Sequence, residues 1–235
     1  RLGFFGDIDI DTSRVPGTAD QVDVDVNLTE RLSGSIRAGI GFGSEQGVIL
    51  NLGVQQDNLF GSGDRAEFIA NSTDSDTLYR VSYLERNYTM SGIDRRWELS
   101  FRDRDADEAD LADYGLETAT LAYGYRIPVN RNDRLGVDLE FDDVTLRFNN
   151  PTVIQQEFEK ENGAGNQVLR TNLAWTRDTR NRAIFPTQGA RQQARLETAL
   201  PSVSDLEYYR ITYEQSRYFG LSERLTLIFD GSVAF

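Results

Sequence analysis

The sequence contains no cysteine and no histidine among its 235 residues. Without cysteine, the chain can form neither a disulfide framework nor a thiolate metal site. Without histidine, it lacks the usual general base at neutral pH and the commonest zinc ligand in proteins. A hydrolase that pairs a serine with a histidine is therefore disfavoured, and no residue is assigned a catalytic role.

Long hydrophobic runs and an excess of positive charge are also absent. No stretch approaches the roughly 18 consecutive apolar residues of a membrane helix. The net charge of −13 argues against nucleic acid, which requires a basic surface. No leader is visible at Arg1, so we expect a processed chain or, preferably, an internal segment. Low hydropathy does not exclude a membrane barrel, because only every second residue of a barrel strand faces lipid.

What the sequence does contain is a period of two. Apolar residues alternate with small, polar or charged residues in segments 36–42, 48–54, 97–101, 135–141, 169–175, 209–213 and 225–233. Such alternation is typical of β-strands, and no long stretch keeps the spacing of a helix. We therefore predict an all-β protein.

Charges at the alternate positions leave two architectures open, a soluble β-sandwich and a transmembrane barrel with a polar lumen. The predicted strands are about 10 to 14 residues long, against about five or six in sandwiches, and this favours the barrel. Short connections near 58–64, 87–94, 128–134 and 219–224 alternate with longer or acidic ones at 103–113 and 149–167. Aromatic residues stand near strand ends, where barrels have interfacial girdles: Phe60, Tyr88, Trp97, Trp175, Tyr209, Tyr218 and Phe219.

A barrel predicts the face on which each residue lies. Lipid should contact Ile36, Leu50, Leu52, Leu99, Leu139, Leu173, Ile211 and Leu227. The lumen should receive Arg37, Glu98, Arg102, Glu140, Arg195 and Glu214. The reason is that an arginine facing lipid near the midplane is unfavourable by roughly 2–4 kcal/mol. We also predict that the turn within 175–191, which contains Pro186 and Gly189, lies on the periplasmic side with the other short connections.

The first 30 residues read as a separate unit. Two strands, 4–11 and 21–30, are predicted around a turn at Pro16 and Gly17, and their alternation fits the edge of a small α+β domain. We place the domain boundary near residues 31–34. About eleven strands are expected beyond it.

Three short segments resemble ligand-binding loops superficially. Residues 7–11 have the carboxylate spacing of a calcium loop, but Thr12 and Thr18 stand where glycine and a bidentate acid are required. Residues 103–108 fail in the same way. Residues 39–43 lack the G-x-G-x-x-G spacing of a nucleotide loop. We therefore predict no metal and no other cofactor.

A resemblance to a known family becomes specific in residues 34–58, which read G-S-I-R-A-G-I-G-F-G-S-E-Q-G-V-I-L-N-L-G-V-Q-Q-D-N. This segment is similar to the first two barrel strands of the BamA family of bacterial outer-membrane assembly proteins. Three earlier segments resemble the end of that family's last periplasmic POTRA domain: R-L-G-F-F (1–5), R-V-P-G (14–17) and Q-V-D-V (21–24). Two later segments also resemble the family. Its mid-barrel turn is similar to W-T-R-D-T-R-N-R-A-I-F-P-T-Q-G-A-R (175–191), and the start of a following strand is similar to E-Y-Y (207–209).

The resemblance implies a domain organisation, a location and partners. Residues 1–31 would be the C-terminal part of a POTRA domain in the periplasm, and 32–235 about eleven of sixteen strands of an antiparallel outer-membrane barrel. The implied activity is to fold and insert β-barrel proteins without ATP, which is not an enzyme reaction. The implied partners are unfolded outer-membrane β-barrel clients, lipoproteins of the assembly complex, periplasmic chaperones and the lipid bilayer. The family's V-R-G-F/Y loop motif and its closing strand have no counterpart in the sequence, so neither role is assigned.

The candidate functional site is the first predicted barrel strand. Its glycines alternate on one face, so few side chains pack against it, and an opened edge can accept an incoming strand by β-augmentation. A purely structural role, in which the glycines accommodate a close backbone or a plug, stays open. The candidate residues for the lateral seam and client pairing are Gly34, Ser35, Ile36, Arg37, Ala38, Gly39, Ile40, Gly41, Phe42 and Gly43.

Other functions remain alternatives. Within the wider superfamily, the chain could belong to a TamA-like assembly factor or to a two-partner secretion pore. A passive porin is the alternative from a different class, and it lacks a POTRA-like stretch before its first strand. Residues 1–31 are therefore the feature that discriminates.

Overall fold

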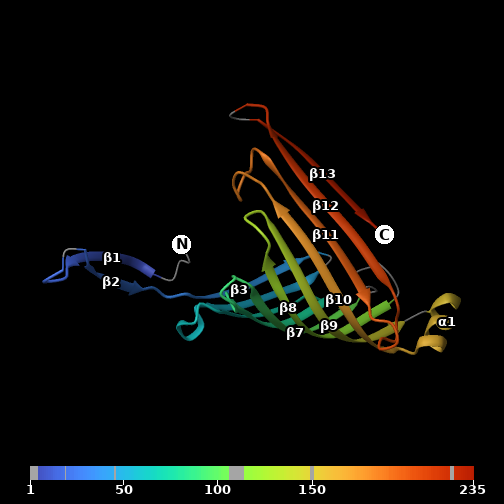
Figure 1. The fold of residues 1–235 in the computed structure, drawn as a ribbon. Helices are drawn as coiled ribbons and strands as arrows, with labels where there is room; N and C mark the ends of the chain where they lie inside the picture. Colours follow the sequence, from blue (N-terminus) through green and yellow to red (C-terminus); the bar gives the residue numbers. More distant parts are fainter. Residues whose placement is uncertain (1–4, 19, 45, 106–113, 149–150, 223–224) are drawn as a thin grey trace.

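The computed structural model describes residues 5–18, 20–44, 46–105, 114–148, 151–222 and 225–235. The strands among them form two separate antiparallel sheets, one of two strands and one of eleven. Figure 1 shows the larger sheet as a strongly curved surface, with the two-stranded hairpin standing apart from it. The predicted fold class, an incomplete antiparallel barrel, is confirmed.

The hairpin consists of β1 (Phe5–Arg14) and β2 (Val22–Glu30). Its turn contains Gly17, whose φ of 87° lies in the left-handed region that glycine tolerates. Strand β1 runs three residues beyond the predicted end at residue 11. Residues 31–33 connect the hairpin to the large sheet, where the domain boundary was predicted. The acidic segment 7–11 lies along an exposed strand, so its carboxylates face solvent as expected.

The eleven-stranded sheet has an uninterrupted up-and-down order, in which each strand pairs with its neighbours in the sequence. Alternating apolar and polar side chains suit such strands because one face is apolar and the other polar. The strands are β3 (Gly34–Gly43), β4 (Gly47–Asp57), β5 (Arg65–Ser72), β6 (Asp76–Glu85), β7 (Asp94–Asp105), β8 (Tyr114–Pro128), β9 (Asp133–Phe148), β10 (Gly165–Asp178), β11 (Gly189–Ala199), β12 (Tyr209–Gly220) and β13 (Thr226–Ala234).

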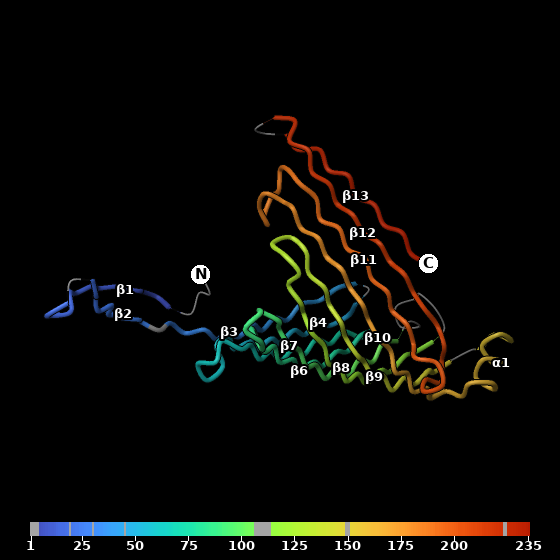
Figure 2. The backbone as a smooth tube through the Cα atoms, in the orientation of Figure 1, coloured from blue at the N-terminus to red at the C-terminus, as the bar shows by residue number. Residues whose placement is uncertain are grey.

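The connections lie at two opposite ends of the sheet. One, here called the turn end, carries the link to the hairpin and the β4–β5, β6–β7, β8–β9, β10–β11 and β12–β13 connections. The path of the backbone is clearest in the tube of Figure 2. The segment 179–188 lies at this end, together with the other short turns, as predicted. The periplasmic location of the turn end stays a prediction.

The opposite end, here called the loop end, carries the one α-helix among the described residues, α1 (Val153–Asn162). Sequence periodicity did not predict this helix. It begins with a capping box, in which Thr152 and Gln155 each accept a backbone N–H of the other. No helix in the described part of the chain is long and apolar enough to cross a membrane. Most of the acidic segment predicted at 103–113 lies outside the described residues.

The strand registers divide the side chains of the large sheet between two faces. On one face, cross-strand neighbours are apolar, as in the pairs Ile40–Leu50 and Leu121–Phe141. The other face carries charged pairs such as Glu140–Arg170. The side chains of Asp138 and Asp142 are buried on this polar face, whereas Leu99 and Leu139 are exposed on the apolar face. All the residues predicted for lipid and for lumen lie on the apolar and polar faces, respectively.

Aromatic residues gather on the apolar face near the turn end. The rings of Trp97 and Tyr123 have centroids 4.2 Å apart, and the guanidinium of Arg95 lies 3.9 Å from the ring centre of Tyr88. Polar atoms of this belt bond to carboxylates at the turns, as where Trp175 Nε1 donates to Asp133 Oδ1 at 3.1 Å. An aromatic with an apolar body and a satisfied polar tip suits a membrane interface.

One residue predicted for the aromatic girdle was assigned wrongly. Tyr218 pairs with Gly189 on β11 and Ile228 on β13, and this register places it on the polar face, whereas Phe219 lies on the apolar face. Nearness to a strand end does not decide the face, because each step along a strand reverses the side-chain direction.

Candidate functional site

All ten residues of the predicted seam lie in one strand, β3, with the predicted bounds. Strand β3 is at one edge of the large sheet, and β13 is at the other. In the described part of the chain, β3 pairs only with β4, from Gly34 opposite Gln56 to Gly43 opposite Gly47. The backbone N–H and C=O groups on its other side therefore have no strand partner there, and such groups can pair with another strand.

The polar face of β3 is nearly bare of side chains. Gly39 and Gly41 lie opposite Asn51 and Ile49 of β4. A Cβ atom added at Gly41 would lie 3.8 Å from Ile49 Cβ, which is an ordinary van der Waals distance. Glycine is therefore not required at this position by a close neighbour, and the space above it is left unfilled.

Charged contacts of β3 are correspondingly weak. Arg37 lies 3.8 Å from Glu67 of β5, and 70% of its side chain is exposed. A solvated ion pair of this length contributes little to stability. The strand is held to the sheet mainly by its backbone ladder to β4 and by the apolar row that begins with Ile36 opposite Val54.

Strands β7 to β11 are held very differently, by a network of ion pairs on the polar face. Its centre is a row of three acids on β9, Asp138, Glu140 and Asp142. Arg170 of β10 contacts Glu140 and Asp142, each at 2.8 Å. Arg96 of β7 reaches Asp138 at 3.1 Å. Each acid has a guanidinium partner, as burial of a charge requires.

Small residues on β8 make the contact between β7 and β9 possible. Gly124 lies between Arg96 and Asp138 in the register of the three strands. A Cβ at Gly124 would overlap the carboxylate of Asp138 and lie 2.7 Å from the carbonyl oxygen of Val137. At this position glycine is required, in contrast to Gly41, because the two charged side chains meet above it.

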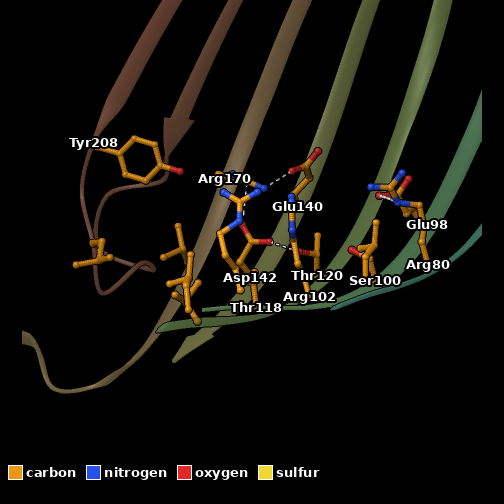
Figure 3. A pocket seen from close by; sticks show the side chains of 16 residues that line it. Arg80, Glu98, Ser100, Arg102, Thr118, Thr120, Glu140, Asp142, Arg170 and Tyr208 are labelled. Atoms are coloured by element: carbon orange, nitrogen blue, oxygen red, sulfur yellow. Dashed lines mark hydrogen bonds and ion pairs between the residues drawn. The ribbon is translucent and has the colours of Figure 1, made fainter. Parts of the chain in front are cut away.

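The network borders an open cavity of about 440 Å³ on the polar face. Figure 3 shows side chains of β6 to β10 pointing into it, with the ion pairs Arg80–Glu98 and Arg170–Glu140 drawn as dashed lines. Tyr208, which precedes β12, donates a hydrogen bond to Glu197 Oε1 at 2.9 Å. Burial raises the pKa of Tyr208 above its ordinary value, so the phenol remains a neutral donor.

The N-terminal end of β3 is held at the turn end by hydrogen bonds to the end of β4. Asp57 N donates to the carbonyl oxygen of Ser33 at 3.0 Å, and Gln56 Nε2 donates to Ser33 Oγ at 2.9 Å. The connection from the hairpin is therefore anchored where β3 begins. Beside it lie the exposed side chains of Leu32 and Phe60, which border an open cavity of about 550 Å³.

The polar groups of the described residues do not form a recognisable catalytic or metal centre. No cluster of three or more metal-binding side chains occurs among them. The buried acids Asp138, Glu140 and Asp142 are each paired with an arginine. Alternation indicated that these residues share a face, but it did not predict which arginine meets which acid. The candidate feature that remains is the edge of β3, which has no second strand partner among the described residues.

Comparison with known proteins agrees with this architecture. The sequence model of the Omp85 superfamily domain matches residues 58–235. The outer membrane protein assembly factor BamA of Neisseria meningitidis serogroup B is 29% identical over 99% of this chain. BamA of Buchnera aphidicola is 29% identical over 40% of this chain and covers 16% of that protein. The expected resemblance to the BamA family is confirmed.

A solved structure shares the fold. It is described as the crystal structure of BamA from Haemophilus ducreyi lacking POTRA domains 1–3, and it matches 100% of this chain with a TM-score of 0.86 and 24% identity. The chain spans 30% of the length of the Neisseria protein and 47% of the Haemophilus chain. Because the family model covers most of its residues, the chain belongs to the Omp85 superfamily.

Proposed function

We propose that this chain is part of an outer-membrane assembly factor that folds and inserts β-barrel proteins without ATP, through a lateral seam at β3. The observation that carries the proposal is the contrast between the weakly packed edge strand and the ion-paired strands β7 to β11. An edge that opens can template an incoming strand, and the client's own hydrogen bonding and burial then supply the driving force. The names of the BamA relatives support this general function.

The N-terminal hairpin is proposed to be the C-terminal part of a periplasmic POTRA domain, in residues 1–31, followed by barrel in 32–235. Its apolar face, formed by Ile8, Ile10, Val24, Val26 and Leu28, is about half exposed. An isolated two-stranded hairpin is marginally stable at best, so this face requires a covering layer. The remainder of a small α+β domain would supply one.

The proposed location and partners follow from the same function. The barrel lies in the bacterial outer membrane, with the hairpin in the periplasm. Its clients are unfolded outer-membrane β-barrel proteins, which periplasmic chaperones deliver, and lipoproteins of the assembly complex cooperate with it. The aromatic belt of the turn end would then lie at the periplasmic surface of the bilayer.

A pair of disulfide tethers tests the seam, and no native cysteine in residues 1–235 competes with the introduced pairs. In the first variant, Gly41→Cys is paired with a cysteine in the closing strand of the intact protein. In the matched control, Gly41→Cys is paired with Ile49→Cys, because the separation of 3.8 Å between Cβ positions suits a disulfide. The control links β3 to β4 and leaves the outer edge of β3 free.

Insertion of a client barrel into vesicles that contain the intact protein is the measurement. The first tether should stop insertion until it is reduced, whereas the control should insert clients at the unmodified rate. If insertion proceeds normally with the first tether shown to be formed, clients do not enter through this edge. Equal inhibition by both tethers would mean that the flexibility of β3, and not its free edge, matters.

A further inference from the structure

Five arginines meet at the turn end of the polar face, in a protein whose overall charge is strongly negative. They come from two neighbouring turns and from the strands beside them: Arg131, Arg134, Arg180, Arg182 and Arg191. They border an open cavity of about 470 Å³, and Asp178 is the one acid in its lining. The lining therefore carries a net charge of +4. The five arginines are here called the arginine cluster.

The arginines of this cluster are largely without partners. Arg180 binds Asp178, with its Nη2 2.7 Å from Oδ2. Arg191 lies opposite Asp178 in the register of β10 and β11, whereas Arg131, Arg134 and Arg182 form no ion pair or side-chain hydrogen bond with the residues that the structure describes. Farther along the same face, Arg96, Arg126 and Arg170 each bind a buried acid. Arg134 and Arg191 also border a neighbouring cavity that Asp138 and Glu140 of the network line, so the cluster adjoins the network but carries an excess of like charges, which repel one another.

The turn that carries Arg180 and Arg182 is held in one shape. Asn181 Oδ1 accepts the backbone N–H groups of Thr187 and Gln188, at 3.1 and 3.3 Å. At its end, Gly189 has a φ of 98°, and a Cβ there would lie 2.7 Å from the carbonyl carbon of Thr179. A turn fixed in this way holds the backbone positions of Arg180 and Arg182 before a ligand arrives, which lowers the backbone entropy lost on binding.

We propose that the arginine cluster binds an acidic polypeptide segment at the mouth of the polar face. Guanidinium groups form bidentate pairs with carboxylates, and the contact of Arg180 with Asp178 already shows this chemistry within the cluster. Lipid phosphate is disfavoured by position, because Arg134 and Arg191 lie on the polar face, opposite to the apolar face and its aromatic belt. Exposed Ile184 and Phe185 at the tip of the turn offer an apolar contact beside the charges.

The experiment measures binding of a short glutamate-rich peptide to the intact protein in a nonionic detergent. The same peptide with every glutamate changed to glutamine is the ligand control. The test variant carries Arg131→Gln and Arg182→Gln, which alter exposed turn residues. The matched control is Arg14→Gln, an exposed arginine on β1 outside the cluster. Folding of each variant is checked by gel electrophoresis, in which a folded barrel that has not been heated migrates differently from the heat-denatured chain.

The glutamate peptide should bind the unmodified protein with an affinity that falls as salt is added, and the glutamine peptide should not bind. The double substitution should reduce affinity roughly tenfold or more, since each charge-assisted hydrogen bond contributes strongly, while Arg14→Gln should not. Absence of peptide binding, or binding that the double substitution leaves unchanged, overturns the proposal. Displacement of the peptide by short-chain phosphatidylglycerol but not by inorganic phosphate would also overturn it, in favour of a lipid. These outcomes do not depend on whether β3 is a seam.

Discussion

Replacement of Arg170 by methionine is the most informative perturbation of the barrel wall. Arg170 lies among three acids, Glu140 and Asp142 at 2.8 Å and Glu197 at 3.6 Å. Methionine keeps most of the side-chain length but removes the charge. The substitution would leave carboxylates on β9 that are only 14% and 4% exposed without their nearest cation.

The magnitude follows from that burial. Removing one partner of a buried ion pair destabilises a protein by about 3–5 kcal/mol, because the remaining charge is left uncompensated. The side chain of Arg170 is 25% exposed, so water compensates part of this loss. We therefore expect the free energy of unfolding to fall by about 3 kcal/mol, at the lower end of that range.

Urea unfolding in lipid vesicles, followed by the fluorescence of Trp97 and Trp175, measures this change. Arg37→Met is the matched control, because Arg37 lies on the same polar face but is 70% exposed, and it should change stability by less than about 0.5 kcal/mol. Adding Glu140→Gln and Asp142→Asn to Arg170→Met should recover part of the loss. A loss below about 1 kcal/mol, or equal losses at Arg37 and Arg170, would refute the assignment of the network as the rigid part of the wall.

Three further substitutions test other features. Gly124→Ala should destabilise the protein by about 1–3 kcal/mol in the same unfolding assay, because its Cβ would collide with a backbone carbonyl and a carboxylate, while Gly41→Ala should change it little. Leu139→Arg should lower stability in bilayers by roughly 2–4 kcal/mol, and a neutral result would contradict a lipid-facing position. Thr152→Ala should weaken α1 by about 1 kcal/mol, seen as faster hydrogen exchange in the helix with no change in the sheet.

Much of the fold was predictable because successive side chains of a β-strand point to opposite faces of the sheet. Alternation fixes which residues share a face, and a strand that faces lipid on one side cannot slip by one residue without reversing every side chain. Alternation over residues 36–42 therefore predicted most of β3, and the resemblance to the BamA family supplied the start of the strand and the barrel architecture. The girdle assignment of Tyr218 was wrong because it relied on nearness to the strand end and not on alternation.

The polar face was less predictable, since its contacts depend on register and on curvature. Alternation places Arg96 and Asp138 on one face, but they belong to strands separated by β8 and meet only because Gly124 leaves room between them. The helix α1 was missed for a different reason. Its ten residues have no apolar stripe that packs on a core, yet the capping box at Thr152 was visible in the sequence.

In the proposed mechanism, client insertion requires movement only of the strands at the β3 edge of the sheet. If clients pair with the outer edge of β3, its ladder to β4 need not break, and both strands can move together as a hairpin. The bare surface at Gly39 and Gly41 then matters because no polar-face side chains there resist bending of that hairpin. The ion-paired strands β7 to β11 have the opposite property, since bending them would separate buried charges. In this mechanism, motion is confined to the glycine-rich edge while the ion-paired strands keep their shape.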